Sequence, residues 1–203
     1  MGIVVKKQPI GVDIPISKIN ERLYTLLIQN AQWANYDAYH RAYANETRKG
    51  IVPEAYTEQS VNTKEYHEVL MNDNVNSTSF FMLNDVNTND GDLFDNSISI
   101  YFQLNTRELY QDVEHRADEE ARNDVIVSLK KIPQVKSIDN VVLGLSNVYA
   151  GFRQDNLTWD DMQPYHVFRI DITVEAMYDC DWICGFTPES VGGFDFLLDG
   201  LMN

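Results

Sequence analysis

The sequence predicts an α+β fold, in which a mostly antiparallel sheet has two principal helices packed on it. Two segments repeat apolar residues at every third or fourth position, which is the period of a helix with one buried side. Two others alternate apolar and polar residues, which is the period of a strand with one buried face. The chain has 203 residues, 44% of them hydrophobic, enough for one ordinary core. We expect a single domain over residues 1–177 with a protruding arm at about 36–76, followed by an acidic-aromatic docking tail over 178–203.

The two principal helices are predicted over residues 16–34 and 112–132. The first has Ser17 as its expected N-cap, and Pro133 ends the second. Both carry one apolar stripe among charged residues, so both should pack on the sheet. The stripes consist of Ile19, Leu23, Leu26 and Leu27 in the first helix, and of Val113, Ala117, Ala121, Val125, Leu129 and Ile132 in the second.

The clearest strands are predicted over residues 97–104 and 168–175, where apolar and polar side chains alternate. Their apolar residues are Ile98, Ile100, Phe102 and Leu104 in the first, and Phe168, Ile170, Ile172 and Val174 in the second. Two further strands are expected over 79–83 and 141–149. The turn-rich stretch 84–96 should connect two strands as a hairpin with a long tip.

The arm and the tail are where we expect function. The arm is too long for a simple connection in a compact domain, and it mixes tyrosines with charged residues. The tail alternates aromatic and acidic residues and has no basic residue, a composition suited to folding onto a partner. The side chains predicted to contact neighbouring subunits or partners are Tyr36, Tyr39, Tyr43, Ile51, Val52, Tyr56, Trp182, Phe186, Phe194, Phe196 and Leu197.

The net charge of −15, from 31 acidic and 16 basic residues, argues against a protein that coats DNA or RNA. Affinity for nucleic acid comes from lysine and arginine side chains that neutralise phosphates. No stretch resembles a signal peptide or a membrane span, so we expect no membrane contact. The two cysteines, Cys180 and Cys184, are too few for a disulfide framework, and the sequence leaves their role open.

No motif predicts catalysis or metal binding. The stretch that begins at Asp85 is similar to a calcium loop, but its glycine, Gly91, comes at the seventh position, and the twelfth position is Asn96 instead of glutamate. Cys180 and Cys184 have no histidine nearby in the sequence to complete a zinc site. The four histidines are scattered, and no serine or cysteine occupies a recognisable nucleophile turn. We therefore expect no cofactor, no metal and no enzymatic activity.

Three short phrases of the sequence carry a family resemblance: Ile51-Val52-Pro53-Glu54-Ala55-Tyr56, Glu65-Tyr66-His67-Glu68-Val69-Leu70 and His115-Arg116-Ala117-Asp118-Glu119-Glu120. Together with the order of helices and strands, they resemble the tail-terminator and head-to-tail connector proteins of tailed bacteriophages. The likeness is to structural proteins of crAss-like and other phages of Bacteroidetes, and it spans about residues 16–177.

This resemblance implies a virion protein of the phage neck or tail, made in the host bacterial cytoplasm. It implies a cyclic homo-oligomer, six-fold or twelve-fold, that contacts adjacent connector, portal or tail proteins and lines a channel through which DNA passes during ejection. An acidic lumen would prevent tight phosphate contacts that stall the DNA. The acidic residues predicted to line it are Asp85, Asp90, Asp92, Asp118 and Glu119.

Two other functions are compatible with the composition. The first is a monomeric acidic adaptor or inhibitor protein that binds a basic partner. The second is a metal-dependent hydrolase that uses the acidic clusters. The oligomeric state separates the first from a ring protein, and a titration with divalent metal tests the second.

Overall fold

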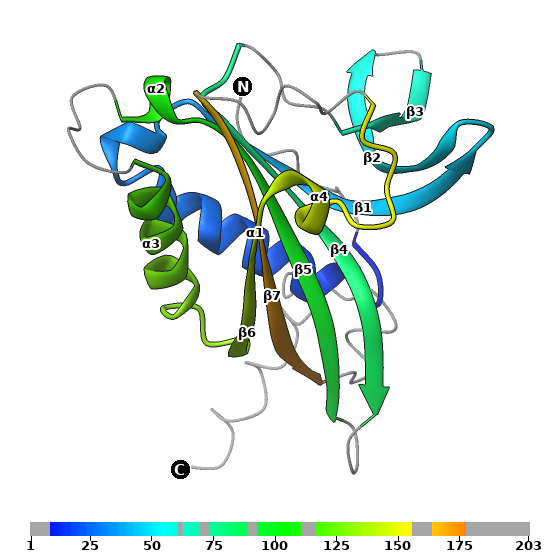
Figure 1. The fold of residues 1–203 in the computed structure, drawn as a ribbon. Coiled ribbons are helices and arrows are strands. Elements are labelled where there is room, and N and C mark those ends of the chain that lie inside the picture. Colours follow the sequence, from blue (N-terminus) through cyan, green and yellow to red (C-terminus); the bar gives the residue numbers. More distant parts are fainter. Residues whose placement is uncertain are drawn as a thin grey trace, which may run out of the picture.

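The computed structural model describes residues 9–60, 63–69, 74–88, 93–110, 117–155 and 164–177. It confirms the α+β class: a seven-stranded, mostly antiparallel sheet is combined with two substantial helices (Figure 1). The elements, in chain order, are α1 (Asp13–Leu27), the 3-10 helix η1 (Ala31–Trp33), β1 (Tyr36–Thr47), β2 (Gly50–Ser60), β3 (Thr63–Glu68), β4 (Ser77–Thr88), β5 (Leu93–Asn105), α2 (Thr106–Leu109), α3 (Ala117–Leu129), β6 (Val135–Leu143), α4 (Leu145–Val148) and β7 (Tyr165–Met177).

The strands lie in the order β3-β2-β1-β4-β5-β7-β6. The β1–β4 pair is parallel, and the other neighbouring pairs are antiparallel. The longest pairing joins β5 and β7 from Leu93↔Met177 to Asn105↔Tyr165. The two strands predicted most clearly from alternation are thus neighbours in the main sheet.

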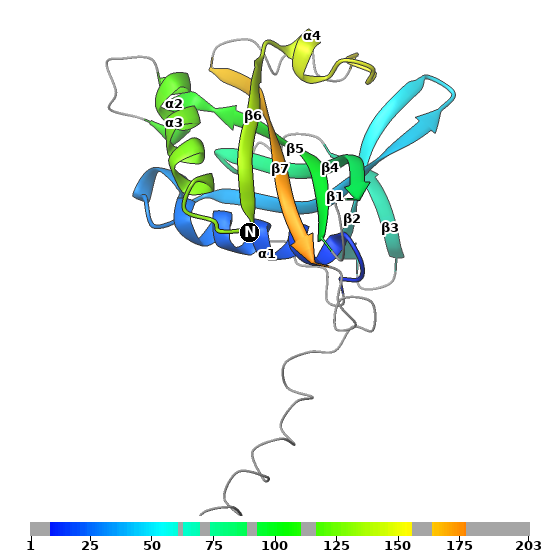
Figure 2. The same cartoon turned by 90° about the horizontal axis from the view of Figure 1, so that it is seen from below.

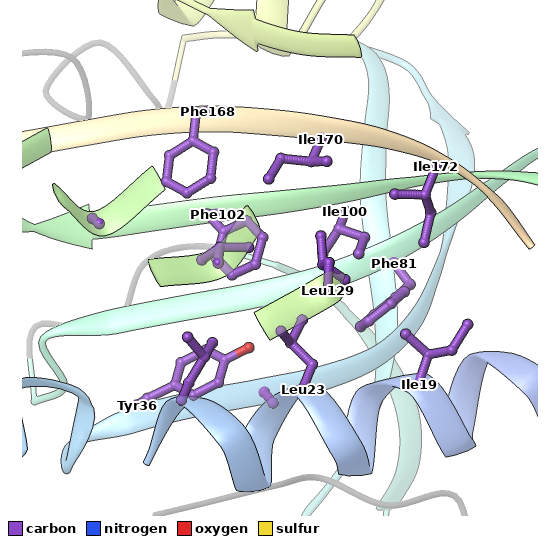
Figure 3. Close-up of a cluster of buried hydrophobic side chains, with 14 of the residues drawn as sticks. Ile19, Leu23, Tyr36, Phe81, Ile100, Phe102, Leu129, Phe168, Ile170 and Ile172 are labelled. Atoms are coloured by element: carbon purple, nitrogen blue, oxygen red, sulfur yellow. The ribbon is translucent and has the colours of Figure 1, made fainter. Parts of the chain in front are cut away.

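The main core lies between the sheet and the α1 and α3 helices. Ile19 and Leu23 of α1 point toward the sheet, and Leu129 of α3 joins them (Figure 3). Phe102 of β5 and Phe168 of β7 stack on this face with ring centroids 4.8 Å apart. Each such side chain, when fully buried, contributes roughly 1.5–3 kcal/mol, so this layer supplies most of the folding energy.

A smaller core lies on the opposite face of the sheet, where α4 covers the strands (Figure 2). Phe80 and Tyr101 stack there with ring centroids 4.7 Å apart, and Tyr149, which follows α4, packs against Tyr101. The α4 cover is short, so the sheet face beyond it carries polar side chains instead of an apolar layer.

The first helix differs from its predicted bounds at both ends. It begins at Asp13, and its N-cap residue is Val12, so Ser17 lies inside the helix, where its hydroxyl donates to the Asp13 carbonyl at 2.7 Å. It ends at Leu27 instead of 34. Asn30 then turns to an extended conformation and caps η1, because the following Trp33 is drawn into the core.

The weaker predictions also need correction. The strand expected over 141–149 starts earlier, at Val135, and ends at Leu143, because Gly144 (φ +81°) turns the chain into α4. The long tip expected over 84–96 is mostly strand, since β4 and β5 pair as far as Thr88↔Phe94. The second principal helix is described from Ala117 to Leu129, inside its predicted range.

Candidate functional site

The β1–β2 hairpin extends beyond the main sheet. The first half of β1 pairs with β4, from Tyr36↔Ser77 to Arg41↔Phe81, and its second half, from Ala42 to Thr47, pairs with β2 alone. Both ribbon views show the hairpin projecting past the other strands (Figures 1 and 2). The predicted arm at 36–76 therefore begins inside the sheet, and only its middle part protrudes.

Three of the side chains predicted to contact partners are buried in the structure. Tyr36 is 1% exposed, Tyr39 7% and Val52 2%. Tyr36 stacks on Tyr24 and meets Trp33 edge to face, and burial raises the pKa of its phenol above the usual range. These three residues are corrected from interface to buried. Tyr36 belongs to the main core and Tyr39 to the smaller core, whereas Val52 is buried near the β1–β2 turn, opposite Asn45.

Three tyrosines form one aromatic cluster on the hairpin and on β3. Tyr56 of β2 and Tyr66 of β3 are direct cross-strand partners with ring centroids 5.7 Å apart, and Tyr43 of β1 lies 5.8 Å from Tyr66. The Arg41 guanidinium lies 4.6 Å from the centre of the Tyr43 ring. Tyr66 is 49% exposed. We name Tyr43, Tyr56 and Tyr66 the tyrosine patch.

The tyrosine patch contains two predicted residues and one that was missed. Tyr66 lies in a strand inside the predicted arm, and no sequence signal identifies it, because its pairing opposite Tyr56 depends on strand register. Ile51 is 38% exposed beside the β1–β2 turn, so it remains available for contact. The other predicted contact residues, Trp182, Phe186, Phe194, Phe196 and Leu197, lie outside the described residues.

The hairpin is braced by the segment that follows α4. The Arg153 backbone N–H donates to the Ile51 carbonyl at 2.7 Å, and the Arg153 guanidinium pairs with the Glu68 carboxylate at 3.1 Å. Gly50 has φ +128°, and a Cβ there would lie 3.3 Å from the Arg153 Cβ. These contacts tie the β1–β2 hairpin to the rest of the domain.

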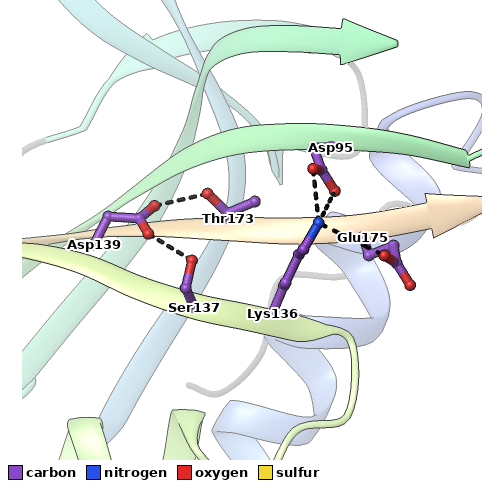
Figure 4. A network of polar contacts seen from close by, with 6 residues as sticks. All are labelled: Asp95, Lys136, Ser137, Asp139, Thr173 and Glu175. Atoms are coloured by element: carbon purple, nitrogen blue, oxygen red, sulfur yellow. Dashed lines mark hydrogen bonds and ion pairs between the residues drawn. The ribbon is translucent and has the colours of Figure 1, made fainter. Parts of the chain in front are cut away.

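Charged side chains gather on the open face of β5, β6 and β7 (Figure 4). Lys136 contacts Asp95 at 2.9 Å and Glu175 at 3.8 Å, and a hydrogen bond to Asp95 raises the Lys136 pKa. Asp139 accepts hydrogen bonds from Ser137 and Thr173. We name this surface the polar sheet face; its residues are Asp95, Lys136, Ser137, Asp139, Arg169, Asp171, Thr173 and Glu175.

The predicted lumen acids do not lie together. Asp85 shares a cross-strand row with Ser97 and Thr173, so it belongs beside the polar sheet face. Asp118 lies on α3, where Arg122 neutralises it at 2.9 Å, and Glu119 is 4.0 Å from the same arginine. Asp90 and Asp92 lie outside the described residues. The acids that the structure does bring together were missed, because the β5–β7–β6 register is not visible in the sequence.

A buried polar row crosses three strands beside the smaller core. Register pairs Asp37 of β1 with Thr78 of β4, and Thr78 with Gln103 of β5. The Asp37 Oδ1, Thr78 Oγ1 and Gln103 Oε1 atoms have no hydrogen-bond partner among the described residues. Desolvation raises the pKa of Asp37, since no side-chain cation of the described residues pairs with its buried carboxylate.

Among the residues that the structure describes, no group of three or more histidine, cysteine, aspartate or glutamate side chains is placed to hold a metal ion. In the same ranges, no helix has the length and apolarity that crossing a membrane requires. No protein-family model, curated protein or solved structure matches the chain. The candidate site is therefore defined by its own geometry: a braced hairpin that presents the tyrosine patch, and an acidic polar sheet face elsewhere on the same sheet.

Proposed function

We propose that this chain is a non-enzymatic structural protein that forms a ring in the head-to-tail connector or tail of a tailed phage. In this role it would join neighbouring rings and line a channel for DNA. The observation that carries the proposal is the tyrosine patch, which the braced hairpin and β3 hold together toward one edge of the sheet. Tyrosine is enriched at protein interfaces, since it supplies a large contact area and a hydroxyl group at low entropic cost.

The position of the hairpin favours a head-to-tail contact between copies. The tyrosine patch lies toward the β3 edge of the sheet, and β6 forms the opposite edge. An interface is heterologous when an element of one copy contacts a different surface of the next copy. Such interfaces form a closed ring when the rotation that relates neighbouring copies adds up to a full turn. We therefore place the tyrosine patch between adjacent subunits.

The outer strand β6 is poorly suited to pairing with a strand of another subunit. The β6 strand has irregularities between Val135 and Ser137 and between Ile138 and Asn140, and its Lys136 and Asp139 are charged. Bulges and charges of this kind protect a sheet edge against pairing with another chain. This supports an interface made by the side chains of the hairpin, without strand addition at β6.

The polar sheet face supports the channel part of the proposal. It combines four carboxylates, from Asp95, Asp139, Asp171 and Glu175, with two cations, and Asp85 lies in an adjoining position. Excess negative charge weakens contact with DNA phosphates, and the whole chain has a net charge of −15. We propose this face, in place of the α3 acids, as the lumen surface.

Mass photometry and negative-stain electron microscopy of the purified chain test the proposal. We expect closed rings of six or twelve subunits at micromolar concentration, and we expect the Tyr43→Ser/Tyr66→Ser double variant to shift the population toward monomers. Ile10→Ser is the matched control, because Ile10 is 65% exposed and lies away from the hairpin, before α1. A wild-type chain that stays monomeric, or a double variant that assembles as the control does, would count against the ring.

The second candidate function is a monomeric acidic adaptor or inhibitor that binds a basic partner. It is favoured by the same acidic surplus on the polar sheet face. A monomer that binds a polycation such as poly-lysine with an affinity that falls steeply with salt would support it. Asp139→Asn/Asp171→Asn should then weaken the binding, and the tyrosine variants should leave it unchanged.

A further inference from the structure

A groove lies between α1 and the end of α3, on the helical side of the molecule. Its volume is about 340 Å³, and it is lined by Glu21, Arg22, Thr25, Leu26, Lys131 and Ile132. Leu26 is half-buried and supplies the accessible apolar surface of the groove, whereas Ile132 is 2% exposed and belongs to the main core. The groove thus places one apolar side chain among charged ones, a combination that suits an amphipathic ligand.

Each of the two helices beside the groove also carries an exposed apolar side chain near its end. Ile28, which directly follows α1, is 38% exposed, and Val127 of α3 is 52% exposed. These side chains add apolar surface to the helical side of the molecule.

Two cations in the groove have no partner within the part of the chain that the structure describes. Neither Arg22 nor Lys131 makes an ion pair or a side-chain hydrogen bond there. The other arginines beside core elements, such as Arg122, Arg153 and Arg169, are each paired with a carboxylate. The groove lining therefore has two cations against the single carboxylate of Glu21, beside the apolar Leu26, in a chain whose net charge is −15. This combination favours a ligand that is both acidic and apolar.

We propose that this groove binds the acidic-aromatic tail of the chain itself, residues 178–203. The tail contains Asp179, Asp181, Glu189, Asp195 and Asp199, no basic residue, and the aromatic residues Tyr178, Trp182, Phe186, Phe194 and Phe196. We assign Trp182 as the tail residue that would contact Leu26, and its neighbour Asp181 as the carboxylate that would pair with Arg22 or Lys131.

The origin of the tail supports this assignment. The last described residue before the tail is Met177, at the end of β7. Val174 of β7 pairs with Val135, and the Val135 N–H donates to the carbonyl of Ile132, which lines the groove. The tail therefore starts at the end of the sheet where the groove lies, and the five residues to Trp182 span at most about 18 Å.

The two native cysteines, Cys180 and Cys184, provide the test, because they flank Trp182 and are the only cysteines in the chain. In the full-length Thr25→Cys variant, mild oxidation should join the thiol introduced in the groove to one of these two cysteines, as a disulfide needs Cα atoms about 4.4–6.8 Å apart. Peptide mass spectrometry identifies the bond. Non-reducing gels distinguish a bond within one chain from a bond between two copies, and either product supports the docking.

The control is Asn147→Cys, since Asn147 is also exposed but belongs to α4 on the opposite face of the sheet. We expect the Thr25→Cys bond to form at least about tenfold faster than the control bond, because docking raises the local thiol concentration. Adding Arg22→Glu/Lys131→Glu, or Trp182→Ala, should remove this advantage. Glu21→Cys repeats the measurement from a second position if Thr25→Cys alters the melting curve. Equal rates for groove and control cysteines would overturn the proposal, whether or not the chain forms rings.

Discussion

The two halves of β1 use the same residue type for different purposes. In the inner half, Tyr36 and Tyr39 are buried, because β4 lies alongside and α1 and the smaller core cover the strand. In the outer half, Tyr43 is half-buried and belongs to the tyrosine patch, because β2 is the strand's sole neighbour there among the described residues. A tyrosine in this strand therefore stabilises the fold or presents a surface according to which elements flank it.

The difference between the two halves can be tested with point variants. Residues beside the inner half of β1 and in the core around it should control the free energy of unfolding. Residues of the outer half should control association. Substitutions should therefore lower the free energy of unfolding most in the core and less toward the surface. At the tyrosine patch, a substitution should mainly weaken assembly.

The largest loss should come from Phe102→Ala. This side chain is fully buried in the main core and stacks on Phe168 at 4.8 Å. Truncating a buried phenylalanine costs about 3–5 kcal/mol, from lost transfer energy and the cavity left behind. Urea unfolding of the variant should have a lower midpoint, while the dependence of the unfolding free energy on urea concentration stays unchanged. A loss of unfolding free energy below about 1 kcal/mol would mean that this part of the sheet is poorly packed.

Asp124→Ala should have the next largest effect. One oxygen of Asp124 accepts hydrogen bonds from Asn30 at 3.0 Å, Trp33 at 2.9 Å and Tyr110 at 2.7 Å, so a single side chain ties α3 to η1 and to the end of α2. Removing it leaves three donors without this acceptor, at an expected cost of about 2–3 kcal/mol. The matched control is Asp139→Ala on exposed β6, and an equal loss in both variants would contradict the role of Asp124.

Asp37→Asn should stabilise the protein by about 1 kcal/mol at pH 7, because a neutral amide replaces a buried carboxylate that lacks a paired cation among the described residues. Burial raises the Asp37 pKa, so the folded state holds this proton more tightly than the unfolded state does. The Asp37 carboxyl therefore has a lower pKa in the unfolded chain than in the folded one. As the pH rises through the range between these two pKa values, the wild-type chain should lose stability relative to the variant.

Thermal melts of both proteins between about pH 3 and pH 7 measure this difference. The advantage of Asp37→Asn should be smallest at the acidic end and should grow to a constant value near neutral pH. A difference of the opposite sign, with Asp37→Asn less stable at pH 7, would show that the carboxylate is needed in its charged form.

The smallest change in unfolding should come from Tyr66→Ser. The side chain is 49% exposed on an outer strand, and such surface substitutions usually shift stability by no more than about 0.5 kcal/mol. If the tyrosine patch lies between subunits, the same variant should shift the mass distribution toward monomers. A large loss of stability without a change in assembly would reverse the assignment of the two halves of β1.

The alternation in β5 and β7 and the apolar stripes of α1 and α3 predicted a large part of the main core from the sequence, but not Trp33 or Tyr36, which also belong to it. Each of these patterns has a period that matches one secondary structure and one buried face. Phe102, Phe168 and Ile170 were all assigned to buried faces in this way. The predicted element ends were less accurate: α1 ends at Leu27 because Trp33 reaches Asp124, a contact between residues far apart in the chain.

What the sequence determined by itself was the α+β class, the two helices, the central strands and the acidic balance of the chain, because these depend on local periodicity and on composition. The tertiary structure alone decided which tyrosines are core and which are surface, the pairing of Tyr56 with Tyr66, and the gathering of charged side chains on the polar sheet face. Those features depend on strand order and register, which are set by contacts between residues distant in sequence and leave no periodic signal along the chain.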